Sequence, residues 1–131
     1  MATHVTGTTR IPLRWRDLDS QSHVFHGVHV ALFDQARAAM LGDALGTADL
    51  EYVVVRLEID YSAELTLADS PVGVNCSVAG LGNTSIVLVE KMHTATGALV
   101  ASTRAVIVLW DVATRTPRAL TLADRRALGR Q

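Results

Sequence analysis

The longest regular pattern in the chain is a helical one. Over residues 28–45 the sequence VHVALFDQARAAMLGDAL is rich in Ala, Leu and Met, and its apolar positions recur at helical spacing. Its few polar positions, among them Asp34, Gln35 and Arg37, form a narrow stripe, which is typical of a helix that is covered on most sides. Gly46 follows, and glycine favours a helix end because it readily takes positive φ. The pattern therefore predicts one long helix over this range.

Strand-like patterns lie on both sides of the predicted helix. Apolar and polar residues alternate before it, and runs dominated by Val, Ile and Thr follow it, so that the expected strands are 8–15, 51–61, 72–81, 84–93 and 99–110. The connections between the later runs are short and rich in turn formers, and short connections join antiparallel neighbours. We therefore predict an α+β fold, in which an antiparallel meander of five strands packs one face against the helix.

The sequence also predicts a short helix at the C-terminus and a packing role for the two tryptophans. Residues 121–129 read TLADRRALG, in which Thr121 suits an N-cap and Asp124 suits a first helical turn, so we expect a short C-terminal helix. Trp15 and Trp110 close the first and the last predicted strand. We expect both indole rings to act as packing anchors.

The bulk composition restricts the class of protein. A chain of 131 residues suits one compact core, so we expect a single domain over residues 1–131. A net charge of −1 lacks the clustered Lys and Arg that bind nucleic acid, and the apolar runs are too short to span a membrane. Because Cys76 is the only cysteine and the N-terminus shows no signal-peptide pattern, we expect a cytoplasmic protein without disulfides.

The polar residues that could perform chemistry are concentrated between the first strand and the long helix. This short stretch contains Asp17, Asp19, His23, His26 and His29. A loop that leads into a helix N-terminus has unpaired amide groups, which can hold a carbonyl oxygen as it becomes an oxyanion. A carboxylate beside that site could attack a thioester carbonyl or activate water, and an imidazole could relay the proton.

The same residues allow other interpretations. The aspartates and histidines could be caps or turn formers, and we expect Asp17 in particular to accept backbone amide bonds. His23, His26 and His29 are spaced by three and could bind a metal ion, but His23 precedes the expected helix, so we predict no metal site. From the spacing alone, a catalytic and a structural role for this cluster both remain open.

A family resemblance extends this interpretation. The stretch DLDSQSHVFHGVHVALFDQAR, residues 17–37, resembles the pattern D-x-D-x-x-G-x-V-x-x-x-x-Y followed by a helix with an acidic residue and Ala-Arg. That pattern is found in the 4-hydroxybenzoyl-CoA thioesterase-like family of hot-dog proteins, whose order of elements also matches the predicted one. The resemblance implies a hot-dog fold, a five-stranded antiparallel sheet wrapped around one long central helix, and the activity of an acyl-CoA thioesterase.

The resemblance implies roles for three positions in the segment between the first strand and the helix. The second aspartate of the pattern is the catalytic carboxylate, as nucleophile or general base, and falls on Asp19. The pair Phe25 and His26 resembles the Tyr-His of the branch associated with the Tol-Pal cluster, in which the histidine assists the carboxylate. The amides near His26 to Val28 would polarise the thioester carbonyl, which makes Val28 a candidate substrate-binding residue.

Other positions depart from the family pattern or are matched less specifically. His29 replaces the customary tyrosine of the pocket wall, and Ser22 replaces a glycine, which raises the steric cost if positive φ is required there. The stretch GLGNTSIVLVEKM resembles the turn and strand where Ser or Thr contacts pantetheine, and on that basis Thr84 and Ser85 are expected to bind substrate.

Partners and an alternative function also follow from the resemblance. The substrate would be an acyl-CoA or an acyl-carrier protein, with coenzyme A as part of the substrate and no separate cofactor. The family implies a homodimer or homotetramer in which two chains place their helices back to back. Because Ser22 and His29 replace the usual glycine and tyrosine, a non-catalytic module that binds acyl-CoA or acyl-carrier protein is the alternative.

Overall fold

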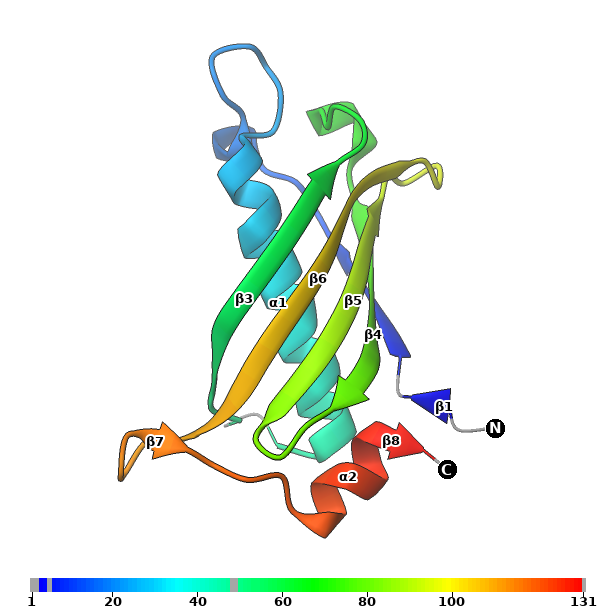
Figure 1. Ribbon diagram of the computed structural model, residues 1–131. Coiled ribbons are helices and arrows are strands. Elements are labelled where there is room, and N and C mark those ends of the chain that lie inside the picture. The colour runs from blue at the N-terminus through cyan, green and yellow to red at the C-terminus, as the bar shows by residue number, and fades with distance from the viewer. Residues whose placement is uncertain (1–2, 5, 48–49, 131) are drawn as a thin grey trace.

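One long helix lies along one face of an antiparallel sheet (Figure 1). The computed structural model describes residues 3–4, 6–47 and 50–130. The helix is α1 (His26–Leu45), and the strands of the main sheet are β2 (Thr6–Ile11), β3 (Tyr52–Tyr61), β4 (Val72–Leu81), β5 (Ser85–His93), β6 (Leu99–Asp111) and β7 (Thr116–Pro117). The smaller elements are β1 (Thr3–His4), β8 (Gly129–Arg130), α2 (Leu122–Leu128) and two 3-10 turns, Trp15–Asp17 and Leu67–Asp69.

The order of the strands confirms the predicted α+β fold and corrects its topology. The main sheet runs β2-β4-β5-β6-β3, with the short β7 also on β6, and all of these pairs are antiparallel. Only β4, β5 and β6 form a meander, so the prediction of a five-strand meander is wrong. The connection 62–71 carries the chain from β3 across the ends of β6 and β5 to β4, a step of about 14 Å that ten residues span easily.

The ends of the first strand and of the long helix also differ from the prediction. The first strand ends at Ile11 and not at residue 15, because Pro12 has no amide hydrogen to continue the ladder. Trp15 therefore lies in a 3-10 turn and is 80% exposed, so its predicted role as a packing anchor is wrong. The helix begins at His26, two residues before the predicted start, and Gly46 ends it at a φ of 69° as expected.

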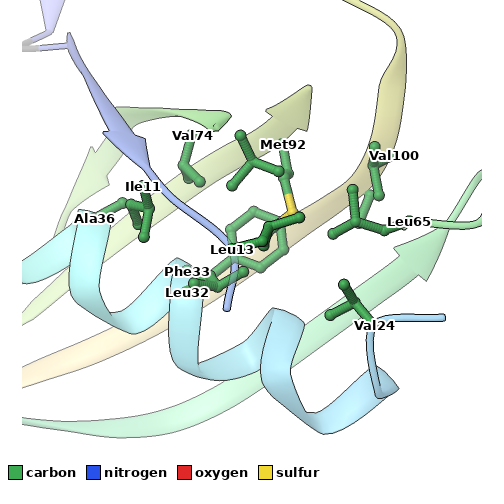
Figure 2. Close-up of a cluster of buried hydrophobic side chains, with 12 residues drawn as sticks. Ile11, Leu13, Val24, Leu32, Phe33, Ala36, Leu65, Val74, Met92 and Val100 are labelled. Atoms are coloured by element: carbon green, nitrogen blue, oxygen red, sulfur yellow. The ribbon is translucent and has the colours of Figure 1, made fainter. Parts of the chain in front are cut away.

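The core lies between α1 and the inner face of the sheet. Phe33 is completely buried, and together with Leu32 and Ala36 it packs against side chains of β2, β4 and β5 (Figure 2). Met92 and Val74 are two of those sheet residues, and both are also fully buried. Burial of apolar surface on this scale is the main favourable contribution to folding, at roughly 25 cal/mol per Å².

One polar group interrupts this core. Arg37 points inward from α1 and forms two bonds with the Glu90 carboxylate of β5, Nε to Oε2 at 2.8 Å and Nη2 to Oε1 at 2.7 Å. Thr103 Oγ1 donates to the same carboxylate at 2.5 Å, and the Cys76 thiol donates to it at 3.4 Å. The sequence predicts Arg37 in a polar stripe with Asp34, and Arg37 Nη1 does lie 3.4 Å from Asp34 Oδ1, but the guanidinium is buried in the core.

The electrostatics of this buried group are consistent with a charged pair. Burial alone would lower the pKa of Arg37, but the hydrogen bonds and the charge of Glu90 outweigh it and raise the pKa. Burial raises the pKa of the Cys76 thiol, and the Glu90 charge adds to that effect, so the thiol stays protonated. The helix is thus tied to three neighbouring strands through one carboxylate.

Removing one member of this pair should destabilise the fold strongly. Arg37→Met leaves the Glu90 charge buried and unpaired, so we expect a loss of about 3–5 kcal/mol in the free energy of unfolding. The double variant Arg37→Met/Glu90→Met should regain more than half of that loss, because no buried charge is left. Arg56→Met breaks an exposed pair with Glu58 and should cost less than about 1 kcal/mol.

Urea unfolding of the four proteins at one chain concentration measures these differences. An Arg37→Met variant that unfolds at the same urea concentration as Arg56→Met would contradict the stabilising role of the buried Arg37–Glu90 pair.

Candidate active site

The site begins with an anchored aspartate. Asp17 is buried, its Oδ2 accepts the Arg14 amide at 2.8 Å, and its Oδ1 faces the Arg14 guanidinium at 3.0 Å. Burial would raise the pKa of Asp17, but the Arg14 hydrogen bonds and charge outweigh it and hold the pKa below its ordinary value. The Asp17 carbonyl accepts the Phe25 amide at 2.9 Å and so closes the loop 18–24 at its base. Asp17 therefore has the structural role predicted for it.

The loop above this anchor is a tight turn around Asp19. Asp19 Oδ1 accepts the amides of Gln21 at 2.8 Å and His23 at 3.2 Å, while the Asp19 amide donates to the His23 carbonyl at 2.7 Å. Ser22 has a φ of 63°, so serine occupies the left-handed conformation for which the family pattern has glycine. Among the described residues, none bonds to Asp19 Oδ2. One oxygen of this exposed carboxylate holds the turn, and the other is free.

The start of α1 offers free amide groups beside this turn. Its N-cap is Phe25, which supplies no side-chain cap, and the Val28 amide donates to the Phe25 carbonyl at 2.8 Å. In the described part of the chain, the amides of His26 and Gly27 have no hydrogen-bond acceptor. A Cβ on Gly27 would lie 2.7 Å from the Phe25 ring, so only glycine lets that ring fold over the helix start. The two free amides point to a place where an oxyanion could be held.

Three rings gather at this end of the helix. The hydroxyl of Tyr61, the last residue of β3, donates to the His26 carbonyl at 2.8 Å. The Tyr61 ring meets the His29 ring edge-on at 5.0 Å and the His26 ring at 6.5 Å. His26 is exposed, whereas His29 is buried with its Nδ1 at 3.3 Å from the Phe25 carbonyl. Burial lowers the pKa of His29, so its imidazole is held neutral.

These groups border a cleft of about 410 Å³ between the loop before α1 and the loop after β3. It brings together three of the predicted site residues, Asp19, His26 and His29. The opposite wall was not predicted: it consists of Tyr61, Ser62, Ala63, Glu64 and Leu65. His23 Nε2 reaches Glu64 Oε2 at 2.8 Å across the mouth of the cleft. No motif marks residues 61–65, and they reach the site only because β3 ends there.

The other predicted substrate-binding residues are not in this cleft. The Val28 side chain packs against the core, and its amide is already bonded. Ser85 is level with Val53 in the sheet, whereas Tyr61 is level with Ala101 eight residues further along β3. At about 3.3 Å per residue, Thr84 and Ser85 lie roughly 25 Å from the cleft within one chain.

The described residues contain neither a candidate metal site nor a helix that could span a membrane. Within residues 3–4, 6–47 and 50–130, no group of three or more His, Cys, Asp or Glu side chains could hold a metal ion. No helix in the same ranges is long and apolar enough to cross a membrane.

The curled antiparallel sheet around one long helix, with a cleft at the helix start, defines an α+β protein of the hot-dog class (Figure 1). The model of the thioesterase superfamily matches residues 21–101, well over half of the chain, and the chain belongs to this superfamily. The chain is therefore a member of the thioester hydrolases. The match includes His26 and His29 and begins two residues after Asp19.

Individual relatives agree with this assignment. The chain is 27% identical over 119 residues to the acyl-CoA thioester hydrolase YbgC of Escherichia coli O6:H1, covering 85% of this chain and 88% of the relative. A predicted thioesterase from Bacillus stearothermophilus superposes with a TM-score of 0.84 at 26% identity, over 94% of this chain and 93% of that one. A Thermus thermophilus thioesterase complexed with coenzyme A and Zn superposes with a TM-score of 0.80 at 27% identity, covering 92% and 90%.

The lowered pKa of His29 predicts a pH dependence of stability. Because the folded state keeps His29 neutral, the unfolded chain takes up this proton first as the pH falls. The stability due to neutral His29 is fully present above about pH 6.5, the ordinary histidine value, and is lost as the pH falls below it towards the folded pKa. His29→Gln cannot titrate but keeps a donor for the Phe25 carbonyl. Its thermal unfolding midpoint should therefore fall less than that of the wild type when the pH is lowered from 7.5 to 5.5.

Thermal unfolding of both proteins across that pH range measures the difference. Parallel pH profiles for wild type and His29→Gln would contradict the neutral, buried state of His29.

Proposed function

We propose that the chain is an acyl-CoA thioesterase in which Asp19 performs the chemistry and His26 assists it. The observation that supports this most directly is that Asp19, with Oδ2 free, and the start of α1, with two free amides, border the same cleft. The E. coli relative is named an acyl-CoA thioester hydrolase, and the Thermus structure contains coenzyme A. Both support acyl-CoA as the substrate class.

In the proposed reaction the thioester carbonyl oxygen accepts hydrogen bonds from the His26 and Gly27 amides. Asp19 Oδ2 then either attacks the carbonyl carbon or removes a proton from the water that attacks it. The C–S bond breaks, the thiolate of coenzyme A leaves, and His26 is placed to relay the proton. If Asp19 is the nucleophile, water then hydrolyses the acyl-enzyme anhydride. Turnover in ¹⁸O-labelled water tests for the nucleophilic route, because label appears in Asp19 only when water attacks the Asp19 carbonyl of the anhydride.

The remaining parts of the proposal are the branch, the cofactor and the location. The adjacent Phe25 and His26 rings, 4.3 Å apart, support the branch of the family associated with the Tol-Pal cluster. The reaction needs only water besides the thioester, so no cofactor is proposed. The proposed location is the cytoplasm, which suits a chain whose single cysteine is a buried free thiol.

Substitutions at the two proposed catalytic positions should have graded effects. Asp19→Asn removes the nucleophile or base but can still accept the loop amides, so we expect kcat to fall at least 10³-fold, within the range for loss of an acid–base or nucleophilic group. His26→Gln should reduce kcat only about 10–100-fold, because a water molecule can relay the proton in place of the imidazole. Asp43→Asn, at an exposed aspartate near the far end of α1, should keep wild-type kcat.

The activity of the wild type and the three variants is measured as thiol release from a panel of short, long and aromatic acyl-CoAs, detected with a thiol reagent. Equal thiol release by wild type and Asp19→Asn would overturn the catalytic assignment. Binding of acyl-CoA without any thiol release would favour the non-catalytic binding module.

We further propose that two chains associate through β3. This strand pairs with β6 on one side, and in the described part of the chain no strand pairs with its other side. Its first half is apolar and exposed at Val53, Val54 and Val55, whereas the opposite edge strand β2 reads TGTTRI. An unpaired apolar edge favours pairing with a second strand. Because Tyr61 ends β3 and lines the cleft, a partner on β3 would lie next to the site.

A charge placed on this edge should prevent association. Val55 is 58% exposed in one chain, so Val55→Lys should fold, but a lysine facing a second strand should shift the protein from dimer to monomer. Val89→Lys places the same charge on the central strand β5, where the side chain is 38% exposed, and should remain dimeric. Sedimentation equilibrium gives the masses. A monomeric wild type, or a dimeric Val55→Lys variant, would contradict an interface at β3.

A further inference from the structure

A second polar cleft lies on the outer face of the sheet, the face turned away from α1. It has a volume of about 360 Å³ and lies where β2, β4 and β5 meet the turn 94–97. Ile11, Val72 and Met92 point to the core, so their neighbours Arg10, Gly73 and His93 face outward. The cleft is therefore separated from the proposed catalytic site by the thickness of the sheet.

The basic side chains at this corner of the outer face are not neutralised within the chain. Among the described residues, the side chains of Arg10 and His93, which line the cleft, have neither a hydrogen-bond partner nor an ion-pair partner, and no carboxylate lines the cleft. Lys91, two residues before His93 on β5, also has no such partner in the described part of the chain and lies outside the lining. Four other arginines, at positions 14, 37, 56 and 118, each have a carboxylate partner. The outer face thus concentrates uncompensated positive charge at one corner.

A glycine forms the floor between two of these side chains. Gly73 pairs with Arg10 on β2 and with His93 on β5, so it lies midway between them in one row of the sheet. Its φ is not in the left-handed region, and a Cβ on it would meet nothing within 4 Å. Neither the backbone nor the packing therefore requires glycine. With strands about 4.8 Å apart, Arg10 and His93 begin about 10 Å from each other across an open floor.

Hydrogen-bond donors surround this floor. Asn75 Nδ2 donates to Thr8 Oγ1 at 3.1 Å, which leaves the Thr8 hydroxyl hydrogen free to donate. The hydroxyls of Thr94 and Thr96 lie 3.1 Å apart in the turn at the other side, so one donates to the other and one of the two hydroxyl hydrogens remains free. The His93 imidazole carries an N–H in either protonation state. An anion with several oxygens could accept bonds from these free donors.

We propose that this cleft binds a phosphate group, seated over Gly73 between Arg10 and His93. A guanidinium donates two parallel bonds to phosphate oxygens, and an imidazole N–H and hydroxyl donors suit an anion with several oxygens. The phosphate could come from the nucleotide part of a coenzyme A substrate or from a separate phosphorylated small molecule. The chemistry of recognition is the same for both sources.

The test uses inorganic phosphate as the probe and reads binding, not catalysis. Gly73→Val fills the floor while it keeps the Arg10 and His93 side chains, and valine suits a strand. Arg10→Gln removes the charge and keeps the fold. Each should raise the Kd for phosphate at least tenfold in an NMR titration. The matched controls are Ala79→Val on the same strand and Arg104→Gln on the same face, and both should bind within twofold of wild type.

Three results would overturn the site: no saturable phosphate binding by wild type, an unchanged Kd in Gly73→Val, or an equal loss in Arg104→Gln. An equal loss in Arg104→Gln would mean that phosphate binding depends only on the overall charge of the surface. Because the readout is binding, inactivity of the enzyme would not affect this test.

Competition then distinguishes the two sources of phosphate. If the bound group is the nucleotide of the substrate, coenzyme A should displace inorganic phosphate and pantetheine, which lacks phosphate, should not. If it belongs to another molecule, a small phosphomonoester should displace phosphate better than coenzyme A does. Both results support the site and identify its ligand.

Discussion

The bond between Arg37 and Glu90 is the constraint on which the position of everything else depends. The inner surface of α1 consists mostly of Ala, Leu and other apolar side chains, and burial of such surface has no preferred direction. A guanidinium that meets a carboxylate through two nitrogens has a fixed geometry. Because Glu90 is also bonded from β4 and β6, this geometry sets the rotation of α1 and its position along the sheet. The first turn of the helix is thereby placed next to the end of β3.

Once α1 is placed, backbone bonds build the site at that end. The Val24 amide donates to the Leu65 carbonyl at 2.7 Å, which joins the loop before α1 to the loop after β3. Tyr61 adds its bond to the His26 carbonyl, and His23 and Glu64 meet at the mouth. These contacts offset the cost of a serine at positive φ in the Asp19 turn, a conformation that serine takes at a cost of about 1 kcal/mol or more.

The sequence was a good guide to local structure and a poor one to what meets across the fold. Periodicity predicted β4 over residues 72–81 without error and the helix to within two residues, because both signals depend on neighbours along the chain. It placed Arg37 in a narrow polar stripe and could not predict its burial, because the partner that makes burial possible is 53 residues away. Tyr61 and Glu64 were missed for the same reason, since they meet the loop before α1 only where β3 ends and the connection 62–71 begins.

The exposure of the site is itself informative about how the protein works. Asp19 and His26 are exposed in one chain, yet two amide donors act more strongly on a developing oxyanion where water is excluded. The open edge of β3 ends at Tyr61, on the wall of the same cleft. A second chain on that edge would bury the exposed valines and reduce the access of water to the cleft in a single step. The proposed association through β3 and the proposed chemistry at Asp19 are therefore linked, because a partner on this edge would supply the water-excluded surroundings that an oxyanion site favours.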